Sequence, residues 1–183
     1  MDYINIINKY YGQEDSDLRR VLITHSQSVT RKALQIAALH PELNLDTDFI
    51  EEAAMLHDIG IIQCDAPSIH CHGTEPYILH GILGAEMLRH EGYERHARVC
   101  ERHTGAGIEV SDIQSQNLPL PHRDFCPETL EEKVICYADK FFSKTRLDHE
   151  KTIEEAERSL MKFSGNGVER FREWERMFDT LSV

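Results

Sequence analysis

The chain has 183 residues, 28% of them charged, and a formal net charge of -12 at pH 7. This acidic balance argues against nucleic acid or an anionic membrane as a main partner. No apolar run approaches the ~20 residues that span a bilayer, and the N-terminal stretch MDYINIINKYYG lacks the features of a signal peptide. The five cysteines are irregularly spaced and form no C-x-x-C pair, which favours reduced thiols and predicts a cytoplasmic protein.

Helical periodicity dominates the first third of the chain. The stretch DLRRVLITHSQSVTRKALQIAALH follows Ser16, a good N-cap residue, and stops at Pro41, and its apolar residues recur at helical spacing. A second helix is predicted from about Asp48 to Ile59. Gly60 is expected to close it, because glycine is a good helix terminator.

A long loop, IIQCDAPSIHCHGTEPYI, is predicted next, and loops of that length are often functional. Shorter helices are predicted at about 79–91, 94–104 and 110–117. A Pro-rich loop then leads to the helix LEEKVICYADKFFSKT. A capping box of Thr129 and Glu132 marks the start of that helix.

The C-terminal region predicts two further helices. Thr152 and Glu155 form a second capping box before IEEAERSLMKF, and residues 164–167 break the chain. The final helix is amphipathic and carries three aromatic residues that predict a core face or a dimer face, with core preferred: Phe171, Trp174 and Phe178.

No repeat, low-complexity tract or convincing strand is visible in the sequence. We therefore expect one all-α domain over residues 1–183, a helical bundle with a catalytic core at about 18–146. Residues 150–183 are expected to form a C-terminal helical cap, and the protein to be a monomer or a homodimer.

Several polar residues fall on apolar helix faces. His25 lies between Leu22 and Val29 on the buried stripe of its helix, and Asp139 shares an apolar face with Ile135. In all, six polar side chains from five helices are predicted to point inward: His25, His57, Asp58, His80, His103 and Asp139.

A single inward histidine is usually a hydrogen-bonded core residue, whereas an unpaired inward carboxylate is costly. Six separate partners would be needed to satisfy these groups one by one, and a single metal cluster would satisfy them all. Because successive helical residues project about 100° apart, His57 and Asp58 can flank one groove. The shorter Asp58 is then expected to reach between two metals.

The pattern resembles the HD superfamily of metal-dependent phosphohydrolases. The resemblance covers about residues 18–146. It rests on six residues in five ordered pieces of sequence: His25 in THSQSV, the pair in LHDIG, His80 in LHGILGAEM, His103 in RHTG and Asp139 in EEKVICYADK.

Within that superfamily, ILHGILGAE and LEEKVICYADK, with an arginine seven residues past the aspartate, resemble the symmetrical diadenosine-tetraphosphate hydrolases. The whole chain also resembles a group of small HDIG proteins. It departs from many HDIG sequences in carrying Ile61 where they have lysine. It also lacks the tripeptide that marks the cyclic-dinucleotide phosphodiesterase branch.

The resemblance implies a binuclear centre. His25, His57 and Asp139 would hold one divalent metal ion, His80 and His103 the second, and Asp58 would bridge the two ions. Nitrogen and oxygen donors without thiolate suit Fe, Mn, Co, Zn or Mg. His57 and Asp58 are the implied catalytic residues, since the chemistry would be in-line attack on phosphorus by a metal-bridged hydroxide.

Four further residues are candidates for binding the substrate. If the last core helix continues, Arg146 lies about two turns past Asp139, ~10 Å along the same face, and could reach a second phosphate. Lys140 and Lys144 are weaker candidates, since cations are common at helix C-termini. In HCHG, three adjacent donors rarely close on one zinc ion, so His72 is instead expected to face the substrate.

Three functions stay open from the sequence. The first is a hydrolase acting on a small phosphorylated substrate, either a phosphomonoester or a nucleotide (poly)phosphate. The second is a mixed-valent di-iron oxygenase, since oxygenases of this superfamily have a similar ligand set. The third is a non-enzymatic sensor or scaffold, which ranks last because that function predicts an incomplete ligand set.

Overall fold

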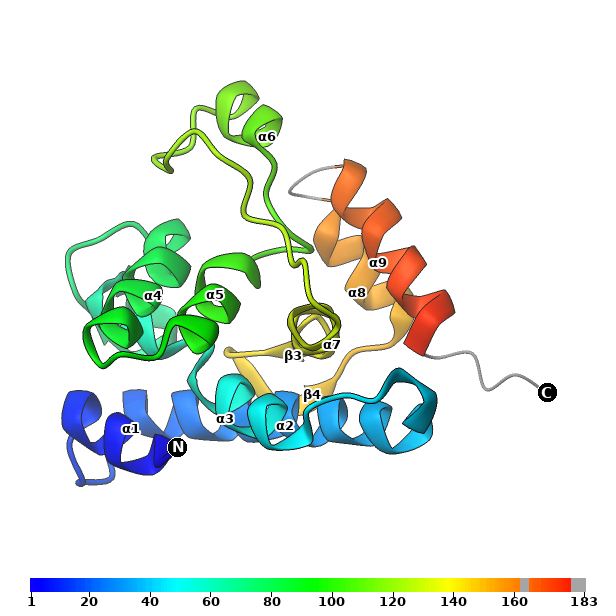
Figure 1. Ribbon diagram of the computed structural model, residues 1–183. Helices are drawn as coiled ribbons and strands as arrows, with labels where there is room; N and C mark the ends of the chain where they lie inside the picture. The colour runs from blue at the N-terminus through cyan, green and yellow to red at the C-terminus, as the bar shows by residue number, and fades with distance from the viewer. Residues whose placement is uncertain (162–164, 179–183) are drawn as a thin grey trace.

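A computed structural model describes residues 1–161 and 165–178 of the protein. Over these residues the fold is almost entirely helical (Figure 1). The helices are α1 (Tyr3–Tyr11), α2 (Asp17–Leu39), α3 (Thr47–Leu56), α4 (His80–His90), α5 (Glu94–Arg102), α6 (Val110–Ser115), α7 (Leu130–Asp139), α8 (Ile153–Leu160) and α9 (Gly165–Phe178). The strands are β1 (Asp65–Ala66), β2 (Cys71–His72), β3 (Phe142–Ser143) and β4 (Arg146–Glu150). The all-α prediction is confirmed.

The predicted helix starts are formed by the expected side chains. The Ser16 hydroxyl accepts a hydrogen bond from the Arg19 backbone N–H at the start of α2. At α7, Thr129 accepts from the Glu132 N–H while the Glu132 carboxylate accepts from the Thr129 N–H, so the capping box is complete. The box before α8 is complete in the same way. These bonds satisfy backbone donors that a helix start leaves unpaired.

The expectation for Gly60 was wrong. Helix α3 ends at Leu56, and Gly60 lies inside a 3₁₀ turn that follows it, Ile59–Gln63. A Cβ at Gly60 would lie 2.1 Å from the His80 carbonyl oxygen and 2.3 Å from the Gly84 backbone nitrogen. Glycine is therefore required here because the 3₁₀ turn packs directly onto the backbone of α4.

Two short hairpins correct the prediction that the chain lacks strands. The predicted long loop contains the antiparallel pair β1–β2, in which Asp65 pairs with His72. The helix predicted past residue 140 instead ends at Asp139, and the chain turns back through the antiparallel pair β3–β4. Arg146 is therefore the first residue of a strand and does not share a helix face with Asp139.

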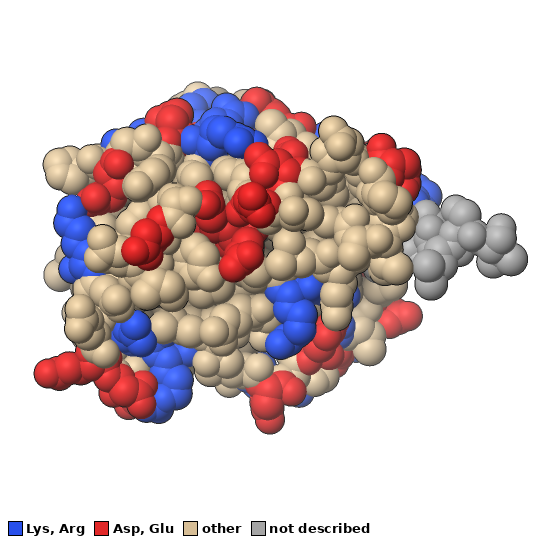
Figure 2. Space-filling view, turned by 60° about the horizontal axis from the view of Figure 1, so that its bottom comes forward, with Lys and Arg blue, Asp and Glu red and all other residues tan. Residues whose placement is uncertain are grey.

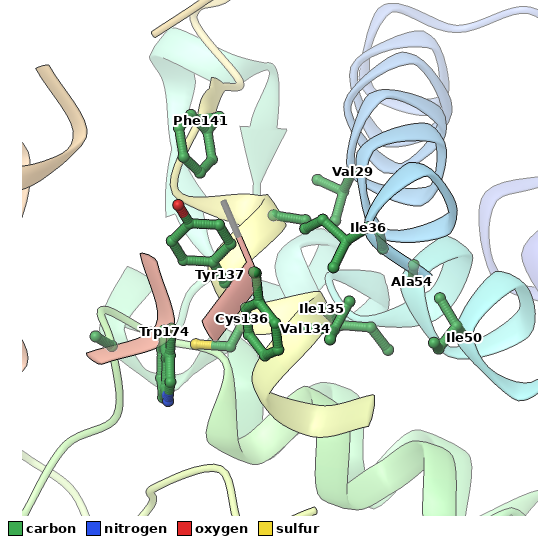
Figure 3. Packing of buried hydrophobic residues seen from close by; sticks show 14 of the residues in the cluster. Val29, Ile36, Ile50, Ala54, Val134, Ile135, Cys136, Tyr137, Phe141 and Trp174 are labelled. Atoms are coloured by element: carbon green, nitrogen blue, oxygen red, sulfur yellow. The ribbon is translucent and has the colours of Figure 1, made fainter. Parts of the chain in front are cut away.

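The main hydrophobic core surrounds α7, which Figure 1 shows near the middle of the molecule. Figure 3 shows Val29 and Ile36 of α2 facing Ile135 of α7, with Trp174 of α9 on the other side. The three aromatic residues of α9 are buried, as the sequence predicted: Phe171, Trp174 and Phe178. The predicted chain break is only partly described, since Ser164 lies outside the described residues and α9 begins at Gly165.

The structure also describes the thiols and the length and polarity of the helices. All five thiols are free, and burial raises the pKa of Cys64 and Cys71 to about 11. Over the described part of the chain, every helix is too short or too polar to cross a bilayer.

The close approach at Gly60 can be tested by stability. The added methyl of Gly60→Ala would overlap backbone atoms of α4 that side-chain rotation cannot move, so we expect about 3 kcal/mol of destabilisation in urea unfolding. Gly92→Ala is the control, since a Cβ at Gly92 meets nothing within 4 Å. Gly92 has a φ of 85° just after α4, where the Tyr93 N–H donates to the Leu88 carbonyl, and alanine in such a left-handed helix end should cost only about 1 kcal/mol. Equal losses in the two variants would contradict the packing argument.

The contribution of α9 to the core gives a second prediction. Phe171→Ala removes a fully buried ring and should lower the free energy of unfolding by roughly 3–5 kcal/mol. Met177→Ala is the matched control on the same helix, because Met177 is 39% exposed. We expect its effect to stay within about 0.5 kcal/mol. A small effect of Phe171→Ala would show that α9 is not part of the cooperative core.

Candidate metal centre

Six buried polar side chains meet where helix ends converge. His25 comes from the middle of α2, and the others come from residues at or next to helix ends: His57 and Asp58 after α3, His80 at the start of α4, His103 after α5 and Asp139 at the end of α7. All six are at most 7% exposed. They form two groups whose donor atoms lie within 4.8 Å of one another.

The first group contains His25, His57, Asp58 and Asp139. His25 Nε2 lies 2.9 Å from Asp139 Oδ1 and 3.1 Å from Asp58 Oδ2. His57 Nε2 lies 3.0 Å from the same oxygen of Asp58 and 3.5 Å from Asp139 Oδ1. Two imidazole nitrogens therefore face two carboxylates across one small space.

The second group contains His80, His103 and Asp58. Asp58 Oδ1 lies 3.3 Å from His103 Nε2 and 3.5 Å from His80 Nε2, and the two ring nitrogens lie 3.0 Å apart. The two oxygens of Asp58 thus face different groups. Asp58 is the residue that the two groups share.

Hydrogen bonds to nearby backbone carbonyls orient three of the imidazole rings toward the cluster. The Nδ1 atoms of His57, His80 and His103 each lie 2.7 Å from the carbonyl oxygen three residues earlier, a distance at which Nδ1–H donates to that oxygen. In a neutral ring, this bond fixes the tautomer and leaves Nε2 as a lone-pair donor directed into the cluster. Histidines that hold metals are oriented by such bonds in many proteins.

The donor chemistry fits bound cations. Burial lowers the pKa of both His80 and His103, so their facing Nε2 atoms both carry lone pairs and cannot hydrogen-bond to each other. The Nε2 atoms of His25 and His57 and both oxygens of Asp58 are buried without a hydrogen bond of good geometry. Divalent ions placed among these atoms would satisfy all of them at once.

Electrostatics keep the carboxylates charged. Burial opposes ionisation of Asp58, but His57 and Lys144 hold the pKa of its carboxyl well below the usual range. Burial likewise opposes ionisation of Asp139, and Lys140 and His25 keep its pKa low. Burial, with His103 nearby, lowers the pKa of His80 to about 3. Burial opposes protonation of His57, but Asp58 and Asp139 raise its pKa to about 9, so the ring carries a proton that a bound cation would displace. Ionised carboxylates and neutral imidazoles are the forms that bind metals.

A cavity of about 170 Å³ opens over the cluster, lined by His80, His103 and Asp139 among others. Lys140 and Lys144 also line it. Lys144 Nζ lies 2.6 Å from Asp58 Oδ2, and Lys140 Nζ lies 2.7 Å from Asp139 Oδ2. The cavity therefore places ammonium groups directly beside the cluster.

The four substrate-binding candidates separate in the structure. Lys140 and Lys144 line the cavity over the cluster, whereas Arg146 is exposed on β4 and lines a neighbouring cavity. His72 is exposed on β2 and is not among the residues lining either cavity. The higher rank given to Arg146 depended on a continuous helix, which the β3–β4 hairpin replaces.

Two residues beside the cluster escaped sequence reasoning. Lys151 lines the cavity, and the ring of Tyr77 stacks on His80 with centroids 4.6 Å apart. Lys151 follows β4, and its Nζ donates to the Lys140 carbonyl at 3.3 Å. A hairpin of strands this short has no hydrophobic periodicity to reveal it.

Comparison with known families identifies the class of protein. The HD domain model matches residues 22–143, a range that contains all six clustered side chains. The chain therefore belongs to the HD-domain family, whose members are generally metal-dependent hydrolases.

Three proteins of similar sequence show how far the likeness extends. The chain is 35% identical over 128 residues to the tRNA (cytidine(56)-2'-O)-methyltransferase of Picrophilus torridus and 34% identical over 134 residues to that of Thermoplasma volcanium. These matches cover 69% and 73% of this chain but only 33% of each methyltransferase. The chain is also 34% identical over 145 residues to the uncharacterized protein MJ0778 of Methanocaldococcus jannaschii, with 77% of this chain and 78% of that protein covered. No solved structure matches the chain significantly.

Removal of one donor tests the cluster as a metal site. We expect His57→Ala to weaken metal binding by more than the roughly 10–100-fold that loss of a supporting residue costs, since it removes a donor facing both carboxylates. Metal content after purification and dialysis gives the measurement. His90→Ala, at an exposed histidine, is the control and should retain metal. Full metal content in folded His57→Ala, with folding checked by circular dichroism, would rule out the site.

Proposed function

We propose that the protein is a metal-dependent phosphohydrolase that acts on a phosphomonoester or a nucleotide (poly)phosphate. The observation that carries the proposal is the shared Asp58, whose two oxygens face separate donor groups beneath a cavity lined by lysines. Membership of the HD-domain family supports the hydrolase class. The identity of the substrate and the presence of bound metal ions are proposed.

The donor arrangement suits two divalent ions, of Fe, Mn, Co, Zn or Mg. His25, His57 and Asp139 would hold one, His80 and His103 the other, and Asp58 both. Such ions, when bound, supply an acidified water as nucleophile and neutralise phosphoryl oxygens. They would also raise the local positive charge within an acidic protein.

The chain's own cations would bind and orient the phosphate. Lys140 and Lys144 place ammonium groups at the cavity floor, where removal from bulk water strengthens their attraction for phosphoryl oxygens. In the proposed hydrolysis, a water oxygen bonds to phosphorus, the ester P–O bond breaks, and the proton from water ends on the leaving oxygen. Preorganised cations stabilise the charge that spreads over the phosphoryl group.

An adjoining cavity of about 260 Å³ supports a substrate with an organic part. Its walls include Ile78, Ile108 and Leu118, and it shares Thr104 and Gly105 with the cavity over the cluster. Apolar walls with a few polar groups suit a nucleoside or another mostly uncharged group. The esterified part of the substrate would lie here.

A small substrate also fits the charge of the protein. The face in Figure 2 carries acidic and basic side chains interspersed among uncharged ones, without a broad basic area. Together with the net charge of -12, this supports a small phosphorylated partner over nucleic acid. Methyl transfer to tRNA is not part of the proposal, because the chain spans only a third of the relatives that bear that name.

A metal and substrate panel tests the function. The purified chain is loaded separately with Mn, Co, Fe, Zn or Mg, and orthophosphate release is measured from nucleotides, sugar phosphates and p-nitrophenyl phosphate. Release from at least one substrate, lost in His57→Ala, is the expected result. Absence of release from all of them, together with O₂ consumption and a mixed-valent electron paramagnetic resonance signal, would instead establish an oxygenase.

The role of Lys144 gives a sharper prediction. Lys144→Met removes a buried ammonium beside Asp58, so we expect kcat to fall by roughly 10²–10³-fold, as for other preorganised charge-stabilising groups. Metal content should be retained, because lysine is not a proposed ligand. Lys133→Met on α7 serves as the control and should change kcat less than about twofold. Unchanged kcat in Lys144→Met would exclude this role.

A further inference from the structure

Besides the apolar cavity, a third cavity adjoins the one over the six clustered polar side chains, and its lining is rich in cations. It has a volume of about 330 Å³ and is lined by Ser143, Arg146, His149, Lys151, Glu155, Arg158 and Ser159. Three cationic side chains thus face a single carboxylate. In a protein with a net charge of -12, such a local excess of positive charge favours an anionic ligand at this place.

The lone carboxylate of this cavity already has partners. Glu155 accepts from the Thr152 N–H at 2.9 Å in the capping box of α8 and lies 3.1 Å from His149 Nε2. Among the described residues, neither Arg146 nor Arg158 has a carboxylate oxygen within 4.0 Å, although Glu155 attracts Arg146 and Glu154 attracts Arg158 from farther away. Because neither guanidinium group is held in a direct ion pair, both can bind a ligand, and their planar fork matches the oxygens of a phosphate.

The cationic cavity is continuous with the proposed reaction site. Lys151 and Ser159 line both cavities. A chain of contacts also joins them, since Lys140 Nζ lies 2.7 Å from Asp139 Oδ2 and the Lys140 carbonyl accepts from Lys151 Nζ. One substrate molecule can therefore occupy both.

The cavity is built by the C-terminal part of the chain. Apart from Ser143, its lining residues come after residue 143, where the HD-domain match ends. They lie on β4, on α8 and in the segment between them. The cavity is thus a feature added to the HD domain, in a place suited to selecting among substrates.

We infer that this cavity binds a second phosphate of the substrate, beyond the one that is hydrolysed. The inference rests on the proposed function and narrows it, since simple phosphomonoesters would leave Arg146 and Arg158 unused. Two kinds of substrate carry such a group: a contiguous polyphosphate, and a molecule with two separated phosphates.

Kinetics with three nucleotides test the inference on the Mn-loaded full chain. Adenosine 5'-monophosphate carries one phosphate, adenosine 5'-triphosphate a contiguous chain, and adenosine 3',5'-bisphosphate two separated groups. We expect one of the latter two to have a KM roughly tenfold or more below that of the monophosphate, the size of effect of one charge-assisted contact. Which of the two it is identifies the kind of substrate.

Substitutions of the two arginines test whether the cavity causes the lower KM. Arg146→Gln and Arg158→Gln should each raise the KM for the preferred nucleotide by roughly 5–20-fold, with kcat and the KM for the monophosphate changed less than about twofold. Arg20→Gln, at an exposed arginine outside the cavity, controls for net charge and should have no such effect. Equal KM values for all three nucleotides, or equal effects of the three variants, would overturn the inference.

A binding measurement separates this inference from the proposed function. If no nucleotide is hydrolysed, the proposed function fails, and calorimetry with inorganic tripolyphosphate then decides about the cavity. Binding that Arg158→Gln weakens and Arg20→Gln leaves intact supports a phosphate site. Binding that neither variant alters, or no binding at all, overturns it.

Discussion

The buried carboxylate of Asp58 is the constraint on which the rest of the site depends. It is fully buried, and its two oxygens face imidazoles from different helices without forming hydrogen bonds of good geometry. A buried charge in this state is strongly unfavourable unless cations offset it. The convergence of helix ends on Asp58 is understandable on this basis, because each end brings a group that can pair with the carboxylate or with a cation beside it.

The position of the histidines at helix ends also provides hydrogen-bond partners for backbone carbonyls. Carbonyl groups in the last turn of a helix lack partners within that helix. His57 and His103 follow α3 and α5 directly, and their Nδ1–H groups donate to such carbonyls, so the same bond that satisfies the backbone directs Nε2 into the cluster. The Nδ1–H of His80 donates in the same way to the Tyr77 carbonyl of the 3₁₀ turn before α4, an oxygen that also accepts the His80 backbone N–H. Local backbone chemistry thus preorganises the site before any ion is considered.

The β3–β4 hairpin determines which cations reach the site. A helix continuing past Asp139 would carry Lys144 about 7.5 Å further along its axis. Because the chain turns back instead, the Lys144 ammonium lies 2.6 Å from Asp58, while Arg146 moves to the cavity formed with α8. The hairpin therefore divides the basic residues of one short segment between two adjoining cavities.

The sequence by itself determined the helical class, the capping boxes at Thr129 and Thr152, the buried aromatic face of α9 and the six inward polar residues, whose role as metal ligands stays a prediction. These features depend on local periodicity and on the chemistry of single residues, which a sequence displays directly. Only the tertiary structure decided the end of α7 at Asp139, the use of Gly60 as a packing contact and the meeting of Lys151 with Arg158 around one cavity. Those features arise from contacts between distant segments and from strands of two to five residues, which leave no periodic pattern in the sequence.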